Sequence, residues 1–132
     1  MNIAVDDSCV SAFQDLKAKR EINTVIYRFT DAMDALVVAF QGNVTHDELL
    51  AAVPVSDPVF VVYDLPFADP DGTRRNTVVM ISWCPARADA AQRAASVAGY
   101  SALKDALDGV EVFVEATEHS ELEYQELVSR AG

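Results

Sequence analysis

The sequence predicts an α/β protein in which a single mixed β-sheet is sandwiched by helices. Three observations lead to this fold class. Segments of helical and strand character follow one another in the order α-β-β-α-β-β-α-β-α. One strand segment, residues 76–83, is apolar over most of its length, as expected for a strand covered on both faces. The chain has 132 residues, of which 51% are hydrophobic, so we expect one domain over residues 1–132 with a core of ordinary size.

The first half of the chain is expected to hold a helix, a hairpin and a short capped helix. Residues 6–19 carry apolar side chains at helical spacing behind an acidic first turn. Residues 23–31 and 35–40 are rich in β-branched and aromatic side chains on either side of a turn, which predicts a hairpin. Thr45 and Glu48 have the spacing of a capping box, and the helix they begin must stop before Pro54.

The second half is expected to hold two strands, a long helix, a short strand and a final helix. The strands are residues 59–65 and 76–83, and the sequence Asp-Pro-Asp-Gly at 69–72 marks a tight connection between them. Helical residues then run from 87 to 107 and end at an Asp-Gly turn. A short strand at 111–115 and a helix at 120–130 complete the chain. Trp83 closes an apolar strand, so we expect it to be buried in the sheet interior.

The net charge of −11, from 21 acidic and 10 basic residues, excludes several kinds of partner. A sequence-independent nucleic-acid binder needs a broad basic surface, so we expect no nucleic-acid binding. The same charge disfavours attachment to anionic membranes, and any phosphoinositide binding is expected to be weak. The first ten residues lack a signal-peptide pattern, which favours the cytoplasm. Cys9 and Cys84 are expected to be partly buried thiols rather than a disulfide.

The sequence contains no motif of a catalytic, metal or cofactor site. Phosphate-binding glycine loops, G-x-S-x-G, C-x-x-C and H-E-x-x-H are all missing. His46 and His119 fall at predicted helix starts and are interpreted as surface histidines. Asp69 and Asp71 lack the further ligands of a calcium loop and are interpreted as turn residues. The carboxylates of residues 115–126 are interpreted as a solvated face. We therefore expect neither enzymatic activity nor a bound cofactor or metal.

Three segments, in this order, resemble the actin-depolymerising factor (ADF)/cofilin homology family. Residues 5–17 (VDDSCVSAFQDLK) are similar to its opening segment and first helix. The second similar segment consists of residues 61–64 (VVYD), a loop, residues 74–77 (RRNT) and a strand that ends in Trp83. Residues 100–109 (YSALKDALDG) resemble the end of its long helix, and residues 124–130 fit its C-terminal helix. The resemblance spans nearly the whole chain. It implies the cofilin-like fold, actin as partner, a monomeric state and a place in the cytoplasm and cytoskeleton.

The resemblance also implies two actin-binding surfaces. In this family the N-terminal half of the long helix lies in an apolar cleft of actin. Small residues (Ala91, Ala94 and Ala95) would allow close approach, and Arg93 would supply the one charged contact. The expected monomer-binding residues are Asn2, Ile3, Ala4, Val5, Arg93, Ala94 and Ser96, together with the segment before the C-terminal helix. The expected filament-binding residues are Arg74, Arg75, Glu126 and Arg130.

The chain departs from the family pattern in ways that alter these expectations. Residues 1–7 contain no serine, and Ser8 falls within the first predicted helix, so control by phosphorylation of an N-terminal serine is not expected. Thr77 and Ala95 stand where the family carries basic residues. The interval from Trp83 to Tyr100 is longer than usual by roughly one helical turn. The extra residues lengthen either the loop at 86–89 or the helix, which can break or kink at Gly99 because glycine costs about 1 kcal/mol there relative to alanine.

The small number of basic residues at the expected filament-binding surface predicts how monomer binding compares with filament binding. We expect an actin-binding protein that binds monomeric actin, binds filament sides more weakly, and promotes filament depolymerisation and turnover. The alternatives are a coactosin-like filament binder, a debranching protein similar to glia maturation factor, and a role outside actin biology, enzymatic or scaffolding. Titration of actin monomers separates the first expectation from a coactosin-like protein.

Overall fold

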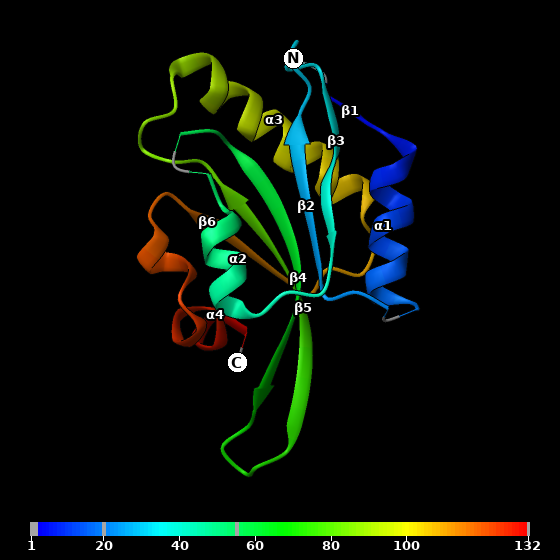
Figure 1. The fold of residues 1–132 in the computed structure, drawn as a ribbon, viewed down its shortest axis with the longest axis vertical. Coiled ribbons are helices and arrows are strands. Elements are labelled where there is room, and N and C mark those ends of the chain that lie inside the picture. Colours follow the sequence, from blue (N-terminus) through cyan, green and yellow to red (C-terminus); the bar gives the residue numbers. More distant parts are fainter. Residues whose placement is uncertain (1–2, 20, 55, 132) are drawn as a thin grey trace.

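Six strands form one mixed sheet with helices on both faces, in a computed structural model that describes residues 3–19, 21–54 and 56–131 (Figure 1). The strands lie in the order β1-β3-β2-β4-β5-β6. The pairs β1–β3 and β5–β6 are parallel, and the other three pairs are antiparallel. Their bounds are β1 Ala4–Val5, β2 Thr24–Phe29, β3 Ala35–Gly42, β4 Val59–Ala68, β5 Arg74–Trp83 and β6 Val112–Ala116. This architecture confirms the predicted fold class.

The helices are α1 Asp7–Lys17, α2 His46–Ala52, α3 Ala90–Ala106, the 3₁₀ helix η1 His119–Leu122 and α4 Tyr124–Ala131. Helix α2 begins at the capping residue that the sequence indicated, and α1 begins within the predicted acidic first turn. Asp6 caps α1 by accepting a hydrogen bond from the backbone N–H of Ser8. At α2, the Glu48 N–H donates to the Thr45 hydroxyl and the Thr45 N–H donates to the Glu48 carboxylate, so the predicted capping box is confirmed.

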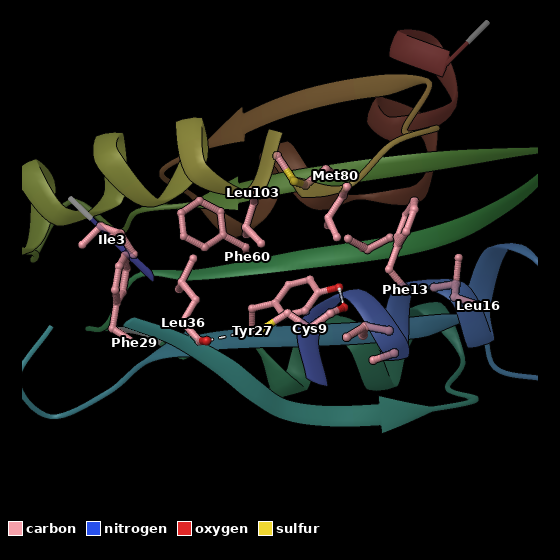
Figure 2. Close-up of a cluster of buried hydrophobic side chains, with 14 of the residues drawn as sticks. Ile3, Cys9, Phe13, Leu16, Tyr27, Phe29, Leu36, Phe60, Met80 and Leu103 are labelled. Atoms are coloured by element: carbon pink, nitrogen blue, oxygen red, sulfur yellow. Dashed lines mark hydrogen bonds between the residues drawn. The ribbon is translucent and has the colours of Figure 1, made fainter. Parts of the chain in front are cut away.

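Alternating side chains divide the interior into two cores, one on each face of the sheet, because successive strand residues point to opposite faces. The first core holds the inner sides of α1 and α3 (Figure 2). The second core holds residues of α2, η1 and α4. In the first core the Tyr27 hydroxyl donates to the Cys9 carbonyl oxygen at 3.0 Å, and the Cys9 thiol donates to the Leu36 carbonyl oxygen at 3.3 Å. These two bonds tie α1 to β2 and β3.

Trp83 and the strand that carries it lie where the sequence placed them. β5 is flanked by β4 and β6, and all its residues from 77 to 83 are buried. Trp83 is 1% exposed, and its indole N–H donates to the Pro54 carbonyl oxygen at 2.8 Å. The prediction of a buried tryptophan on an interior strand is confirmed.

Several elements differ from the expectation. The two-residue strand β1 was not predicted, because two residues are too short for a periodic pattern. β4 continues to Ala68 and β5 begins at Arg74, so their hairpin is longer than expected. The final helix is divided into η1 and α4 by Glu123, whose backbone is extended at ψ 150°. Cys9 is fully buried rather than partly buried. His46 is half-buried rather than a surface histidine, and its Nε2 lies 2.8 Å from the Leu122 carbonyl oxygen.

The long helix neither breaks nor kinks into two helices at Gly99. α3 runs unbroken from Ala90, because Asp89 and Gln92 form a capping box that starts it three residues later than predicted. A Cβ atom at Gly99 would lie 2.8 Å from Phe29 Cζ and 3.0 Å from Phe60 Cε2. The glycine is therefore the residue that lets α3 approach the sheet closely, and residues 84–89 form a loop before the helix.

Candidate functional site

The outer side of the first half of α3 presents small side chains beside one arginine. Ala91, Ala94 and Val97 recur at a spacing of three and are all exposed, with Val97 at 74%. Arg93 is exposed next to them. Its Nη2 donates to the Ala86 carbonyl oxygen at 2.9 Å, which holds the guanidinium over the loop that precedes the helix. We call Ala91, Arg93, Ala94 and Val97 the α3 outer face.

Three residues expected on this surface are buried instead. Ala95 is 1% exposed and belongs to the first core, so it packs α3 onto the sheet rather than meeting a partner. Ser96 is 4% exposed, and Ile3 is 8% exposed within the same core as Ala95. The sequence analysis missed Val97. The repeat at 91, 94 and 97 was the signal for it, because residues three apart on a helix lie on one side.

A hollow of about 470 Å³ joins the α3 outer face to the end of β6. Arg93, Ser96, Val97 and Tyr100 line it from α3, facing Ser82, Cys84 and residues 115–117. Burial, followed by the charge of Glu115, raises the pKa of Tyr100. The Tyr100 ring meets the Phe113 ring edge-on at 6.0 Å, which fixes it in the wall of the hollow.

The segment before α4, also expected at this surface, is held by hydrogen bonds to Glu121 and by a ring contact. The Glu121 carboxylate accepts hydrogen bonds from the backbone N–H groups of Thr117 at 3.0 Å and Glu118 at 3.1 Å. These bonds, led by the Thr117 N–H, lower the pKa of Glu121. The His119 ring lies against the Trp83 ring at 4.8 Å. These contacts hold the segment against β5 beside the hollow.

The N-terminal residues reach α3 through strand pairing. The Ala4 N–H donates to the Asp34 carbonyl oxygen at 2.9 Å, and β1 contacts α3. Ala4 is exposed and Val5 half-buried, so these two expected residues lie beside the long helix. The expected residue Asn2 lies outside the described part of the chain.

The residues expected to bind filaments gather at the other end of the molecule. The β4–β5 hairpin projects beyond the helices at the bottom of Figure 1 and carries Arg74 and Arg75, both exposed. Arg75 Nη1 lies 3.4 Å from Asp69 Oδ1, and its guanidinium stacks over the Phe67 ring at 5.6 Å. Thr77, on the same strand, is 2% exposed and offers no surface.

Helix α4 stands at the base of this hairpin. The Tyr124 hydroxyl donates a hydrogen bond to the Pro66 carbonyl oxygen and so joins α4 to β4. Glu126 and Arg130 are exposed on α4. The hairpin and α4 therefore present all four expected residues on connected elements.

The described residues contain no group of three or more His, Cys, Asp or Glu side chains able to hold a metal ion. Within the same described ranges, no helix is both long enough and apolar enough to span a bilayer.

Comparison with known proteins matches the chain to one family. The family described as "Cofilin/tropomyosin-type actin-binding protein" matches residues 2–132. The chain is 28% identical to the cofilin of Yarrowia lipolytica, over 98% of this chain and 86% of the relative. It is 32% identical to actin-depolymerizing factor 3 of Oryza sativa subsp. japonica, over 91% of this chain and 89% of the relative.

Solved structures agree with these relatives. The crystal structure of Streptomyces griseoflavus cofilin superposes with a TM-score of 0.91 at 26% identity, covering 99% of this chain and 98% of that one. A coactosin from Entamoeba histolytica superposes with a TM-score of 0.83 at 17% identity, covering 98% of this chain and 94% of that one. At that identity the coactosin shares the fold alone.

Proposed function

This chain belongs to the cofilin/ADF family of actin-binding proteins, which are not enzymes, and from that premise we propose that it binds monomeric actin and promotes filament depolymerisation. The α3 outer face, Ala4 and Val5 of β1, and the segment before α4 form the monomer-binding surface. Actin is the proposed partner both at this surface and at the β4–β5 hairpin with α4. The protein acts as a monomer of one domain in the cytoplasm, at the actin cytoskeleton.

The α3 outer face is the observation that carries this proposal. Its side chains are small, so the backbone of α3 can come close to an apolar cleft on a partner. The opposite side of the helix is packed into the first core through Ala95, Gly99 and Leu103. A helix held in this way is already in its binding conformation, so little ordering entropy is lost on association.

Substitution of Arg93 by glutamate tests the monomer-binding surface. We expect Arg93→Glu to weaken binding of monomeric actin at least about tenfold, or about 1.4 kcal/mol, if the guanidinium meets a carboxylate of actin. Lys19→Glu, the control, makes the same charge change just after α1, where it removes a surface ion pair to Asp15 that contributes little to stability. Normal binding of monomeric actin by a folded Arg93→Glu protein would show that α3 is not part of the monomer-binding surface.

We propose that the protein binds the sides of actin filaments more weakly than it binds actin monomers. Side binding needs the hairpin and α4, where Arg74, Arg75 and Arg130 are the basic residues, on a protein of net charge −11. Arg75 is also partly neutralised by Asp69. Repulsion from actin's acidic surface would slow this contact most at low salt, since the Debye length is roughly 8 Å at physiological ionic strength.

A parallel titration of actin monomers and co-sedimentation with filaments tests this preference. Clear monomer binding with weak co-sedimentation supports the proposal. Stable filament decoration without monomer binding would favour a coactosin-like role, and failure to bind actin in either form would overturn the proposed function altogether.

A further inference from the structure

The second face of the sheet is covered by helices over only part of its width. Helix α2, η1 and α4 pack on the second core, whereas Figure 1 shows β2 and β3 uncovered on the viewer's side, beside α2. A groove of about 740 Å³ lies there, a volume within the range of ordinary ligand sites. We call it the α2 groove. Its lining includes no residue of the α3 outer face or of the hairpin end, but it reaches the start of α3 at Gln92, whose Nε2 donates to Asp57 Oδ1 at 3.2 Å.

Apolar side chains form most of the floor and one wall of the α2 groove. Ile26, Leu49 and Val59 belong to the second core and form its floor. Phe40 lines the groove while 40% exposed, which makes it one of the few large apolar side chains in the described chain to face solvent so openly. The Phe40 ring is thus the apolar side chain that an occupant of the groove can cover.

The polar lining of the groove is mainly negative. Its charged residues are Asp31, Glu48, Asp57 and Arg28. The Glu48 carboxylate is engaged in the cap of α2, and Arg28 Nη1 donates to the neighbouring Phe29 carbonyl oxygen at 3.1 Å.

Two of the carboxylates mark one end of the groove. Arg28 pairs with Val59 in antiparallel register, so the residues after β2 and those before β4 lie at the same end of the sheet. Asp31 and Asp57 are therefore together at that end, and both are exposed. A cation on the occupant is complementary to this end and to the −11 charge of the whole chain.

We propose that the α2 groove binds a basic amphipathic helix of a partner protein, laid over β2 and β3 alongside α2. The face of a sheet is closed by helices, and a helix there completes the layer that α2 begins. The six residues of β2 span about 20 Å, which a helix of about 13 residues matches. The helix's apolar side chains contact Ile26 and Phe40, and its basic residues lie at the end marked by Asp31 and Asp57.

The probe for the test is a fluorescent 14-residue helical peptide of leucine and lysine, with a scrambled peptide of the same composition as control. Anisotropy is measured near physiological ionic strength with the full chain. We expect Phe40→Lys to weaken binding at least about tenfold, because it removes the apolar anchor and adds a like charge. Val97→Lys makes the same charge change on α3 and is expected to leave peptide binding unchanged. Equal loss in both variants, or in neither, would overturn the proposal.

A second pair of variants separates the groove from general attraction to an acidic protein. Asp31→Asn with Asp57→Asn should weaken peptide binding, whereas Asp105→Asn with Asp108→Asn, which removes two exposed charges on and just after α3, should not. Equal effects of the two pairs would show charge attraction alone. Equal binding of the scrambled peptide would also contradict the proposal.

Two further measurements locate the peptide-binding site and distinguish peptide binding from the proposed actin binding. Amide NMR shifts on peptide addition should centre on β2, β3 and α2, and shifts centred on α3 or the hairpin would refute the assignment. Shifts of the same groove resonances with protein concentration alone would assign the groove to a second copy of this chain instead. Phe40→Lys should retain monomeric-actin binding, so loss of peptide binding with intact actin binding supports the groove independently.

Discussion

Replacement of Gly99 by alanine sets two opposing effects against each other. In a solvent-exposed helix the change stabilises by about 1 kcal/mol, because glycine loses more backbone entropy on folding. In α3 the new Cβ would lie 2.8 Å from Phe29 Cζ and 3.0 and 3.1 Å from two ring atoms of Phe60. Contacts below 3.0 Å require some atom to move.

The surroundings leave little room for that movement. Phe60 is fully buried and Phe29 is 8% exposed, and the two rings meet edge-to-face with centroids 5.9 Å apart. Overpacking of a core by one methyl group costs about 1–3 kcal/mol. We therefore expect Gly99→Ala to lower the free energy of unfolding by up to about 2 kcal/mol, once the helix-propensity gain of about 1 kcal/mol is subtracted from the packing cost.

Urea unfolding followed by fluorescence of Trp83, the single tryptophan, measures this change. Ala94→Gly on the exposed side of the same helix is the control and should cost about 1 kcal/mol by propensity alone. In a Phe29→Leu background the Gly99→Ala change should cost less, with a coupling of about 1 kcal/mol or more. A Gly99→Ala protein more stable than its parent would refute the argument that close packing requires this glycine.

Three further predictions concern other parts of the chain. Arg74→Ala with Arg75→Ala should reduce filament severing and leave monomer titration unchanged; stoichiometric co-sedimentation unaffected by the pair would contradict the filament surface. Burial raises the pKa of the Cys9 thiol to about 11 from an ordinary 9.0, so above pH 9 the unfolded state loses its proton first and stability falls as pH rises. The free energy of unfolding is expected to fall by about 1.4 kcal/mol at pH 10. Cys9→Ala should therefore show a smaller fall in the urea midpoint between pH 8 and pH 10 than the parent protein. Parallel falls in both proteins would exclude Cys9 as the cause. Ser8→Glu should leave binding of monomeric actin unchanged in the same titration. The reason is that Ser8 lies in the first turn of α1, where its backbone N–H donates to the capping residue Asp6. Abolished binding would instead support control by phosphorylation of this serine.

Much of the fold could be predicted because its signals act between residues close in sequence. The Thr45–Glu48 capping box specifies the start of α2 within one turn. The apolar run at 76–83 identifies an interior strand, because only burial on both faces tolerates it. The motif at 100–109 pointed to the family, and the resemblance made the long helix the expected actin-binding element. For Ala95, helical periodicity alone would have sufficed, since it lies four residues before Gly99 and both face the sheet.

Only the tertiary structure decided how distant segments meet. β1 is a strand solely because β3 offers it an edge, and that pairing brings Ala4 beside α3. The need for glycine at position 99 comes from Phe29 and Phe60, whose rings no local pattern could place against the helix. The α2 groove exists because α2 is too short to cover β2 and β3. Local sequence patterns determine where helices and strands form. The packing of side chains from distant segments determines which of these elements lie together and which surfaces they form.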